Sequence, residues 1–453
     1  MAKTVALSGF PEWLPEQRLV ELEVLDTLRS VFELYGFSSV ETRATEPLDA
    51  LVHSGETSKE IYVLRRLHAE SAGDDSGLGL HFDLTVPLAR YVVEHAGKLS
   101  FPFRRYQIQK AWRGERPQDG RFREFTQADI DIIGRDSLAF HHEVELPLVV
   151  ADAFRRLPLP PWRISVNNRR VIEGFSLGLG VAAESVPAVM RTVDKLDKVG
   201  DKAVHDLLVR DGLTDAQAAS CLELASISAA DSSFVADVRR LGVQHDLLDQ
   251  GLDELARVID AAAEHAPGLL VADLKIARGL DYYTGTVYET QLLGHEDLGS
   301  ICSGGRYDAL ATDGTTMYPG VGISVGVTRL LSRLLGRGLV SASRSVPTCV
   351  LVALADEAAR PAADRIAAAL RSRRIATEVS PEAAKYGKQI RYADRRGIPF
   401  VWFPASESTS HEVKDIRSGE QVQADPSSWS PPAADLRPTI RAVPEFALKE
   451  IAP

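Results

Sequence analysis

The side chains best suited to chemistry lie in a polar turn between two strand-like segments, from Arg113 to Phe125, where arginines recur at positions 113, 116, 121 and 123. A guanidinium offers a planar fork of N–H donors that fits phosphate and carboxylate oxygens, and an aromatic ring can stack on a nucleobase. If the segment after the turn is a strand, Arg121, Arg123 and Phe125 share one of its faces because side chains alternate. The turn therefore predicts a nucleoside triphosphate site, with an exposed charged hairpin as the alternative.

A second group of segments combines glycines with arginines and tyrosines: residues 278–289, 303–308 and 320–330. Glycine inside strand-like sequence weakens the strand, and it is found where a ligand or another backbone approaches closely. The chain has neither a P-loop nor a strand-GxGxxG-helix signature, so a glycine loop at a helix N-terminus is not expected to hold phosphates. We expect arginines to hold them instead.

These segments need a sheet to position them. Apolar residues at helical spacing follow Pro15 and stop near Gly36, which predicts a long amphipathic helix. Strand-like sequence follows at residues 37–42, 80–84, 103–112 and 122–133, and it resumes at 271–293 and 300–327. Successive long strands joined by polar turns are typical of an antiparallel sheet.

Two further regions interrupt or follow this sheet. Residues 171–266 are rich in Ala, Leu, Asp and Val in helical patterns and carry few aromatic residues, which indicates an inserted helical domain. After a linker at 336–345, strand and helix patterns alternate from Cys349 to Ile416, which predicts a small α/β domain. The expected domains are a split sheet domain at 1–170 and 267–337, the helical insertion at 171–266, and the α/β domain at 346–453.

The composition and charge of the chain limit its class. Of its 453 residues, 45% are hydrophobic and 25% are charged, as in a globular protein, and the sequence shows no signal segment or membrane span, so we expect a cytoplasmic protein. The three cysteines are far apart, which favours buried thiols over disulfides or a zinc site. The net charge of −11 counts against nucleic acid as a partner, but residues 371–396 contain eight basic and three acidic side chains. This run is either a solvated helix face or a contact for RNA.

The order of these segments resembles that of the histidyl-tRNA synthetases over nearly the whole chain. The helix and strand that end at Pro47 resemble motif 1 of the class II synthetases, residues 113–131 resemble motif 2, and residues 320–330 resemble motif 3. Arg-Gly-Leu-Asp-Tyr-Tyr from Arg278 and Ser-Gly-Gly-Arg-Tyr-Asp from Ser303 resemble the two histidine-specific motifs of this family. The resemblance implies an α+β catalytic core with an antiparallel sheet flanked by helices, a C-terminal anticodon-binding domain, and a homodimer built by motif 1.

The same resemblance implies an ATP-dependent, AMP-forming histidine-tRNA ligase, whose partners are L-histidine, ATP with Mg²⁺, and tRNA(His). Such an enzyme forms histidyl-adenylate and pyrophosphate, then passes histidine to the 3′ end of the tRNA. The positions that match histidine-binding residues are Asp83, Thr85, Gln127, Asp131, Tyr282, Tyr283, Gly304 and Gly305. The α-ammonium would bind at Asp83, Thr85 and Gln127, and the imidazole would lie between Asp131 and Tyr283.

Nucleotide-binding roles follow from the same resemblance. The positions that match ATP-binding residues are Arg113, Glu115, Arg121, Arg123, Phe125 and Arg329. Phe125 would stack on adenine, Glu115 would approach the nucleotide and its Mg²⁺, and Arg329 would bind the γ-phosphate. Arg113 and Arg278 would hold the α-phosphate from two directions and are the predicted catalytic residues.

In the C-terminal domain, the resemblance implies that Lys388 and Arg391 contact tRNA. Asp83 and Asp131 stand where many bacterial members carry Glu, and Thr328 stands where a Glu commonly precedes the motif 3 arginine. One rival interpretation is a histidine-sensing regulatory paralogue, a subunit of ATP phosphoribosyltransferase that does not aminoacylate. Such paralogues lack the anticodon-binding domain and degrade the second histidine motif, whereas both are intact in this chain. A second rival is an accessory nucleic-acid-binding protein with a class II fold, and the complete set of arginines speaks against it.

Overall fold

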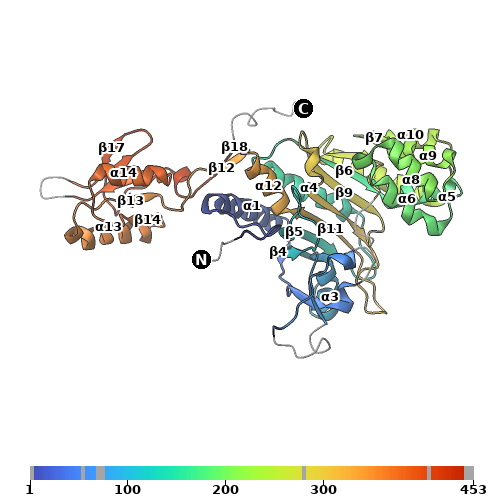
Figure 1. The fold of residues 1–453 in the computed structure, drawn as a ribbon, viewed down its shortest axis with the longest axis horizontal. Coiled ribbons are helices and arrows are strands. Elements are labelled where there is room, and N and C mark those ends of the chain that lie inside the picture. The colour runs from blue at the N-terminus through green and yellow to red at the C-terminus, as the bar shows by residue number, and fades with distance from the viewer. Residues whose placement is uncertain (1–4, 53–56, 68–76, 278–281, 406–409, 443–453) are drawn as a thin grey trace. The chain divides into compact units, whose positions relative to one another are not determined.

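The computed structural model describes residues 5–52, 57–67, 77–277, 282–405 and 410–442. The chain forms two compact units, one built mainly from residues 25–333 and one from residues 12–24 together with 334–450 (Figure 1). None of the helices in the described ranges is long and apolar enough to cross a membrane. The three cysteines are buried free thiols, as the sequence predicts.

The first unit is organised by a nine-stranded sheet in the order β1-β4-β5-β11-β10-β9-β6-β8-β7. Its strands are β1 (Ser38–Ser39), β4 (Phe103–Trp112), β5 (Glu124–Ile133), β6 (Trp162–Asn168), β7 (Ser228–Ala229), β8 (Leu270–Asp273), β9 (Thr286–Leu292), β10 (Cys302–Tyr307) and β11 (Gly320–Gly326). Only the β1–β4 and β6–β8 pairs are parallel among the neighbours of this sheet. The α+β core with a mainly antiparallel sheet is therefore confirmed.

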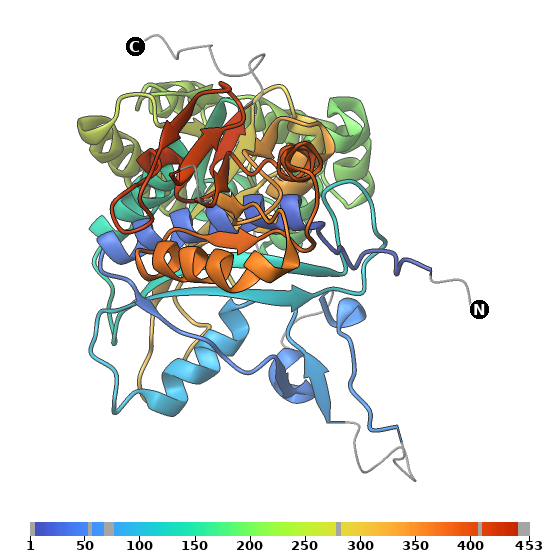
Figure 2. The same cartoon turned by 90° about the vertical axis from the view of Figure 1, so that its left-hand side faces the viewer.

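Helices cover both faces of the β4–β5 part of the sheet (Figure 2). The flanking helices are α1 (Pro15–Leu34), α3 (Thr85–His95), α4 (His141–Arg155) and α12 (Val327–Gly336). Neighbouring residues of β4 face opposite sides: the Tyr106 ring lies 5.9 Å from that of Phe32 on α1, whereas the Arg105 guanidinium donates to the Leu84 carbonyl beside α3. Alternation along one strand thus gives an apolar face under α1 and a polar face toward α3.

A run of helices separates β6 from β8. It consists of α5 (Arg169–Gly178), α6 (Val186–Val193), α7 (Leu196–Val199), α8 (Asp201–Arg210), α9 (Asp215–Ala225), α10 (Phe234–Arg240) and α11 (Asp246–His265). Helices α5 and α11 cross closely, because a Cβ on Gly174 would lie 2.2 Å from the Leu248 nitrogen. The run also returns β7 to the sheet beside β8. The helical content agrees with the predicted insertion, while the domain limits at 171 and 266 remain a prediction.

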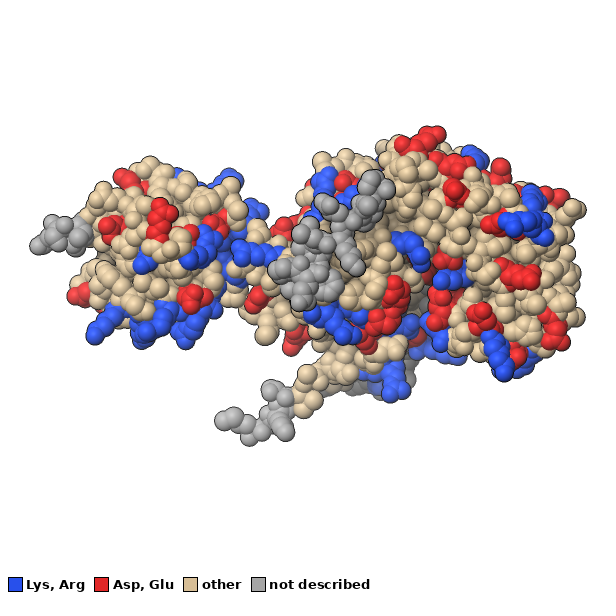
Figure 3. Space-filling model, turned by 90° about the horizontal axis from the view of Figure 1, so that it is seen from above, with Lys and Arg blue, Asp and Glu red and all other residues tan. Residues whose placement is uncertain are grey.

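The second unit contains a five-stranded sheet in the order β14-β13-β15-β16-β17. Its elements are β13 (Val350–Val352), α13 (Arg360–Ser372), β14 (Thr377–Val379), α14 (Tyr386–Arg395), β15 (Phe400–Phe403), β16 (Glu412–Asp415) and β17 (Gln421–Gln423). Val352, Leu370 and Trp402 lie in its buried core. Lys and Arg side chains gather along one edge of this unit (Figure 3). The predicted alternation of strands and helices is confirmed.

Some details of the predicted elements were wrong. The segment 80–84 was expected to be a strand, but β3 (Leu78–Leu80) ends at its first residue, and it pairs with β2 (Thr45–Pro47) ahead of the short helix α2 (Leu48–Leu51). The apolar alternation of His81 to Leu84 instead leads into α3. The predicted linker contains β12 (Val340–Ala342), which pairs with β18 (Ile440–Ala442) and so depends on a partner about a hundred residues away that local sequence does not reveal.

Candidate active site

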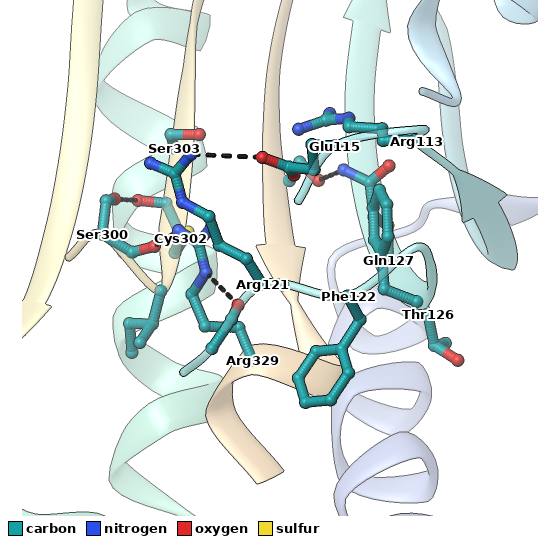
Figure 4. Close-up of a pocket in the computed structure, with 15 residues that line it drawn as sticks. Arg113, Glu115, Arg121, Phe122, Thr126, Gln127, Ser300, Cys302, Ser303 and Arg329 are labelled. Atoms are coloured by element: carbon teal, nitrogen blue, oxygen red, sulfur yellow. Dashed lines mark hydrogen bonds and ion pairs between the residues drawn. The ribbon is translucent and has the colours of Figure 1, made fainter. Parts of the chain in front are cut away.

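The β4–β5 hairpin and the strands beside it form an open cavity (Figure 4). The hairpin is paired from Phe103↔Ile133 to Trp112↔Glu124, so its turn projects beyond a long rigid ladder. The cavity is lined by Arg113, Glu115, Gly120, Arg121, Phe122, Phe125, Thr126, Gln127, Ser300, Ile301, Cys302, Ser303, Ser324, Gly326 and Arg329. Residues from motif 2, motif 3 and the second histidine motif thus meet in one place.

Arg113 is fixed on the cavity wall by two contacts. Its Nε donates to the Phe82 carbonyl at 3.0 Å, and its guanidinium carbon lies 5.1 Å from the centre of the Phe125 ring. Among the described residues no carboxylate forms an ion pair with Arg113, so its guanidinium stays available to an anionic ligand. Arg113 and Phe125 therefore present a cation and an aromatic ring side by side.

Arg329 reaches the same cavity from the first turn of α12. Its Nε donates to the Gly120 carbonyl at 2.9 Å and its Nη1 to the Ser300 carbonyl at 2.6 Å. Gly120 has a φ of +70°, and a Cβ there would lie 2.4 Å from Leu298, so glycine is needed to present this carbonyl. Burial, followed by the charges of Arg121 and Arg113, lowers the pKa of Arg329. Cations gathered in this way favour a polyanionic ligand.

Glu115 and Arg121 lie on opposite sides of the hairpin turn and form an ion pair, with 3.1 Å between Oε2 and Nη1. Among the described residues that line the cavity, Glu115 is the only one with a carboxylate. A single acid among several arginines can bind a cation that accompanies a phosphate chain without cancelling the positive potential of the site.

Arg123 departs from its predicted place. It is absent from the cavity lining, its Nε donates to the Glu115 carbonyl at 3.3 Å, and its side chain packs on Gly9. Because β5 begins at Glu124, Arg121 and Arg123 precede the strand and do not share a strand face with Phe125. That prediction was wrong, and Phe122 lines the cavity where Arg123 was expected.

Residues predicted for the α-ammonium lie beside the arginines. Asp83 is buried next to Thr85, the first residue of α3; its Oδ1 accepts from the Val86 N–H at 3.0 Å and its Oδ2 from the Tyr282 hydroxyl at 3.4 Å. Burial raises the pKa of Asp83, opposed by the Val86 N–H and by Arg113. Gln127 donates from Nε2 to Ser324 Oγ at 2.6 Å, while its buried Oε1 has no hydrogen-bond partner in the described part of the chain.

Asp131 is held from two sides. Its Oδ2 lies 2.7 Å from Nη2 of the fully buried Arg105, and its Oδ1 accepts from the Tyr307 hydroxyl at 2.7 Å. Burial raises the pKa of Asp131, and the Arg105 charge and the Tyr307 hydrogen bond oppose that rise. The charge of Asp131 also raises the pKa of Tyr283, after burial as the main cause, which places that phenol near the carboxylate.

The paired glycines have different surroundings. A Cβ on Gly305 would lie 2.9 Å from the Tyr283 ring, so glycine is required for the ring to pack there. A Cβ on Gly304 would instead lie 2.1 Å from the Gly322 carbonyl and 2.7 Å from Ile323 Cα. Adjacent strand residues point to opposite faces, so only Gly305 forms a floor beneath Tyr283.

The sequence left the role of one contributor to this site open and gave no place to another. Thr328 accepts the Thr126 N–H at 2.8 Å, so it ties β5 to the start of α12 in the position where the family pattern has Glu. Asp129, which is buried and lies between Gln127 and Asp131 on β5, was missed, although the two-residue period of β5 places all three on one face. That alternation was the available signal.

The remaining predicted residues lie elsewhere. Arg278, with residues 279–281, falls outside the described residues. Lys388 and Arg391 are exposed on α14 in the second unit, where Lys388 forms an ion pair with Glu382.

Known proteins resemble both units. The profile of the histidyl-tRNA synthetase family matches residues 9–330, and that of the anticodon binding domain family matches residues 348–429. The histidine–tRNA ligase of Cutibacterium acnes is 57% identical over 452 residues, which cover 97% of this chain and 99% of the relative. A crystal structure of histidyl-tRNA synthetase from Nostoc sp. has 35% identity and a TM-score of 0.83, covering 93% of this chain and 97% of that one.

The sheet topology and the arginine-lined cavity define the catalytic core of a class II aminoacyl-tRNA synthetase. Within that class, the chain belongs to the histidyl-tRNA synthetase family. A structure described as an ATP phosphoribosyltransferase regulatory subunit/histidyl-tRNA synthetase from Bacillus halodurans C has a TM-score of 0.71 at 18% identity, with 86% of this chain and 96% of that one covered, and so shares the fold alone. The similarities favour an aminoacyl-tRNA ligase over the regulatory paralogue.

Proposed function

We propose that this chain is a histidine-tRNA ligase, which activates L-histidine with ATP and transfers it to the 3′ end of tRNA(His). The observation that carries this proposal is the convergence of Arg113, Arg121 and Arg329 on one cavity that Gln127 also lines. The buried Asp83 interacts with Arg113, and the buried Asp131 lies on the same face of β5 as Gln127. Cations suit the triphosphate, and acceptors suit the ammonium and imidazole groups of histidine. Family membership supplies the same assignment independently.

The charges of the substrates determine the mechanism. The histidine carboxylate is ionised at neutral pH, so its attack on the α-phosphorus requires no general base. Catalysis then consists of positioning and of stabilising negative charge that gathers on the phosphate oxygens and on the leaving pyrophosphate. We assign to Arg113 the role of holding the α-phosphate and the histidine carboxylate together, and to Arg278 the opposite side of the phosphate.

The remaining roles follow from the family resemblance, and the residues concerned line the cavity. Phe125, next to Arg113, would stack on adenine, and Arg329 would bind the γ-phosphate. Glu115 is the lining carboxylate suited to Mg²⁺, which would enter with ATP and help neutralise the phosphate chain. For Arg123, the geometry supports only an indirect role through the Glu115 backbone.

The partners of the second unit complete the proposal. Residues 348–429 match an anticodon binding domain, and exposed Lys388 and Arg391 are proposed to contact the anticodon arm of the tRNA. We also propose a cytoplasmic homodimer, in which the segment up to Pro47 forms the interface, and domain limits at 170, 266 and 346, as the sequence predicts.

ATP–pyrophosphate exchange measured with each of the twenty amino acids in turn tests this function. Exchange that depends on histidine is expected, with other amino acids weaker by about 10⁴-fold or more, because a pocket built to bind a ring N–H rejects side chains that lack it. Histidine binding without exchange would contradict the proposal in favour of the regulatory paralogue. Exchange driven by another amino acid would show that the pocket assignment is wrong.

A further inference from the structure

A third buried carboxylate, Asp129, lies on β5 between the residues assigned to the ammonium and the imidazole of histidine. Its side chain is 2% exposed, and its Oδ1 has no hydrogen-bond partner within the described ranges. Gln127 Oε1, on the same face of β5, is also buried without such a partner. Unpaired buried acceptors are costly, so two of them side by side point to a ligand that brings N–H donors.

The charge of this cluster also calls for a cation. Asp83, Asp129 and Asp131 are each 2% exposed, and one fully buried guanidinium, that of Arg105, forms an ion pair with Asp131. Arg105 and, beside Asp83, Arg113 are two cationic neighbours for three carboxylates, so the cluster is anionic when all three are ionised, which is unfavourable away from water. Ser324 fixes the geometry, because its hydroxyl bonds to the Asp129 carboxyl and also accepts from Gln127 Nε2.

We propose that Asp129 is a specificity-determining residue that binds one ring nitrogen of the amino-acid substrate while Asp131 binds the other, so that the imidazole is held as imidazolium. This inference rests on the proposed histidine-tRNA ligase function. A neutral imidazole offers one N–H donor and one acceptor, whereas imidazolium offers two donors and matches two carboxylates. The additional proton is supplied by Asp129: it leaves the carboxyl oxygen for the facing ring nitrogen, giving a carboxylate and an imidazolium, and no other reactant is consumed.

The acidity of Asp129 suits this transfer. Burial raises the pKa of Asp129 to about 7, with Arg105 opposing the rise and with Asp131 and Asp83 adding to it. An imidazole ring has an ordinary pKa of about 6.5, so moving the proton between the two groups costs little. The other titratable groups that interact with Asp129 are Tyr283 and Cys302, and burial is the main cause that raises the pKa of both, so they stay neutral.

The first test compares two amino acids in pyrophosphate exchange: L-histidine and 1,2,4-triazol-3-ylalanine, whose ring has the same size but is far less basic. Asp129→Asn keeps the size of the side chain and removes its charge. We expect kcat/KM for histidine to fall about 10- to 100-fold, with the KM for ATP unchanged and a much smaller fall for the triazole. Equal falls for both amino acids in a normally stable variant would overturn the proposal.

A matched control is Asp273→Asn on β8. Asp273 is 5% exposed, its pKa is also raised by burial, and it forms an ion pair with Lys275, but it lies at the other end of the sheet from β5. Both amino acids should retain near wild-type exchange in this variant. If Asp273→Asn also lost activity with histidine selectively, the loss in Asp129→Asn would be explained by general weakening of the sheet. That result would overturn the role of Asp129.

A second test uses the wild-type protein and therefore does not depend on a variant that folds. At pH 8 free histidine has a neutral ring and Asp129 has already lost its proton to solvent, so solvent must return that proton and binding as imidazolium must take up about one proton per site. Calorimetric titration of histidine in buffers of different ionisation enthalpy measures this uptake, and a value near zero would overturn the proposal. If the wild-type protein catalyses histidine-dependent exchange but takes up no proton, only the role of Asp129 is contradicted. If it neither catalyses exchange with histidine nor binds histidine, the proposed function is contradicted as well.

Discussion

Two arginine-rich regions of this chain use the same side chain for different purposes. In the cavity of the first unit, Arg113 and Arg329 donate to backbone carbonyls and keep their charge directed at an open space. In the second unit, Arg373 donates to the carbonyls of Pro426, Ser428 and Trp429. These hydrogen bonds hold that segment against the domain. The location of the acceptors, and not the number of arginines, separates a binding site from a structural brace.

The basic run at 371–396 shows this division within a few residues. Arg371 donates to the Thr377 carbonyl, and Arg396 pairs with Glu378 and Tyr392, so both support the fold. Lys388 and Arg391 are exposed on α14 instead. The two interpretations left open by the sequence, a solvated face and an RNA contact, therefore apply to only part of the run.

The largest effect is expected in the cavity. Arg113→Ala should reduce histidine-dependent pyrophosphate exchange by about 10² to 10³, because a preorganised donor to the developing phosphate charge is lost. Arg113→Lys should restore activity only in part, since a point charge does not reproduce the planar fork. Arg123→Ala is the matched control, because its side chain is absent from the cavity lining, and it should lose far less. Equal losses of activity in Arg113→Ala and Arg123→Ala would contradict the assignment of Arg113 to the cavity and of Arg123 to a position outside it.

A smaller effect is expected on α14. Reversing both charges, Lys388→Glu with Arg391→Glu, should raise the KM for tRNA about tenfold or more at low salt while leaving pyrophosphate exchange unchanged. The dependence of log KM for tRNA on log salt concentration should also become shallower, since fewer phosphates are neutralised. An unchanged salt dependence would mean that this face of α14 is only solvated.

The smallest effect is expected for the structural brace. Arg373→Ala should lower the free energy of unfolding by about 1 kcal/mol, because several carbonyls in residues 426–430 lose a donor that water replaces in part. Chemical denaturation with pyrophosphate exchange measured in parallel checks this, and exchange should be unaffected. A fall in exchange without a loss of stability would show that Arg373 has been assigned to the wrong group.

Long periodic elements were predictable, while turns and long-range partners were not. The limits of β4 and β15 match the predicted 103–112 and 400–403, because both strands carry several residues in a regular pattern. The place of Arg123 was missed because the end of the hairpin turn, at Glu124, depends on loop geometry that has no periodic signal. The resemblance to a family, and not a periodic pattern, indicated Arg113 and Arg329 as nucleotide-binding residues and Asp83 and Asp131 as histidine-binding residues.

The buried partners of the site were beyond single-sequence reasoning for a different reason. Arg105 reads as one residue of an ordinary strand, and only the pairing of β4 with β5 brings it opposite Asp131. Asp129 follows the visible alternation of β5, but the missing partner of its Oδ1 emerges only when the neighbouring strands are in place. Pairing register, set by tertiary packing, decides which polar residues meet.

Separate measurement of the two half-reactions tests the central division between the units most directly. Rapid quench should follow histidyl-adenylate formation and the transfer of histidine from preformed adenylate to tRNA, in Arg113→Ala and in the Lys388→Glu, Arg391→Glu variant. The account predicts opposite patterns: adenylate formation slows in the first variant with transfer much less affected, and only the tRNA-dependent step weakens in the second. Slowing of both steps in both variants, with stability unchanged, would contradict it.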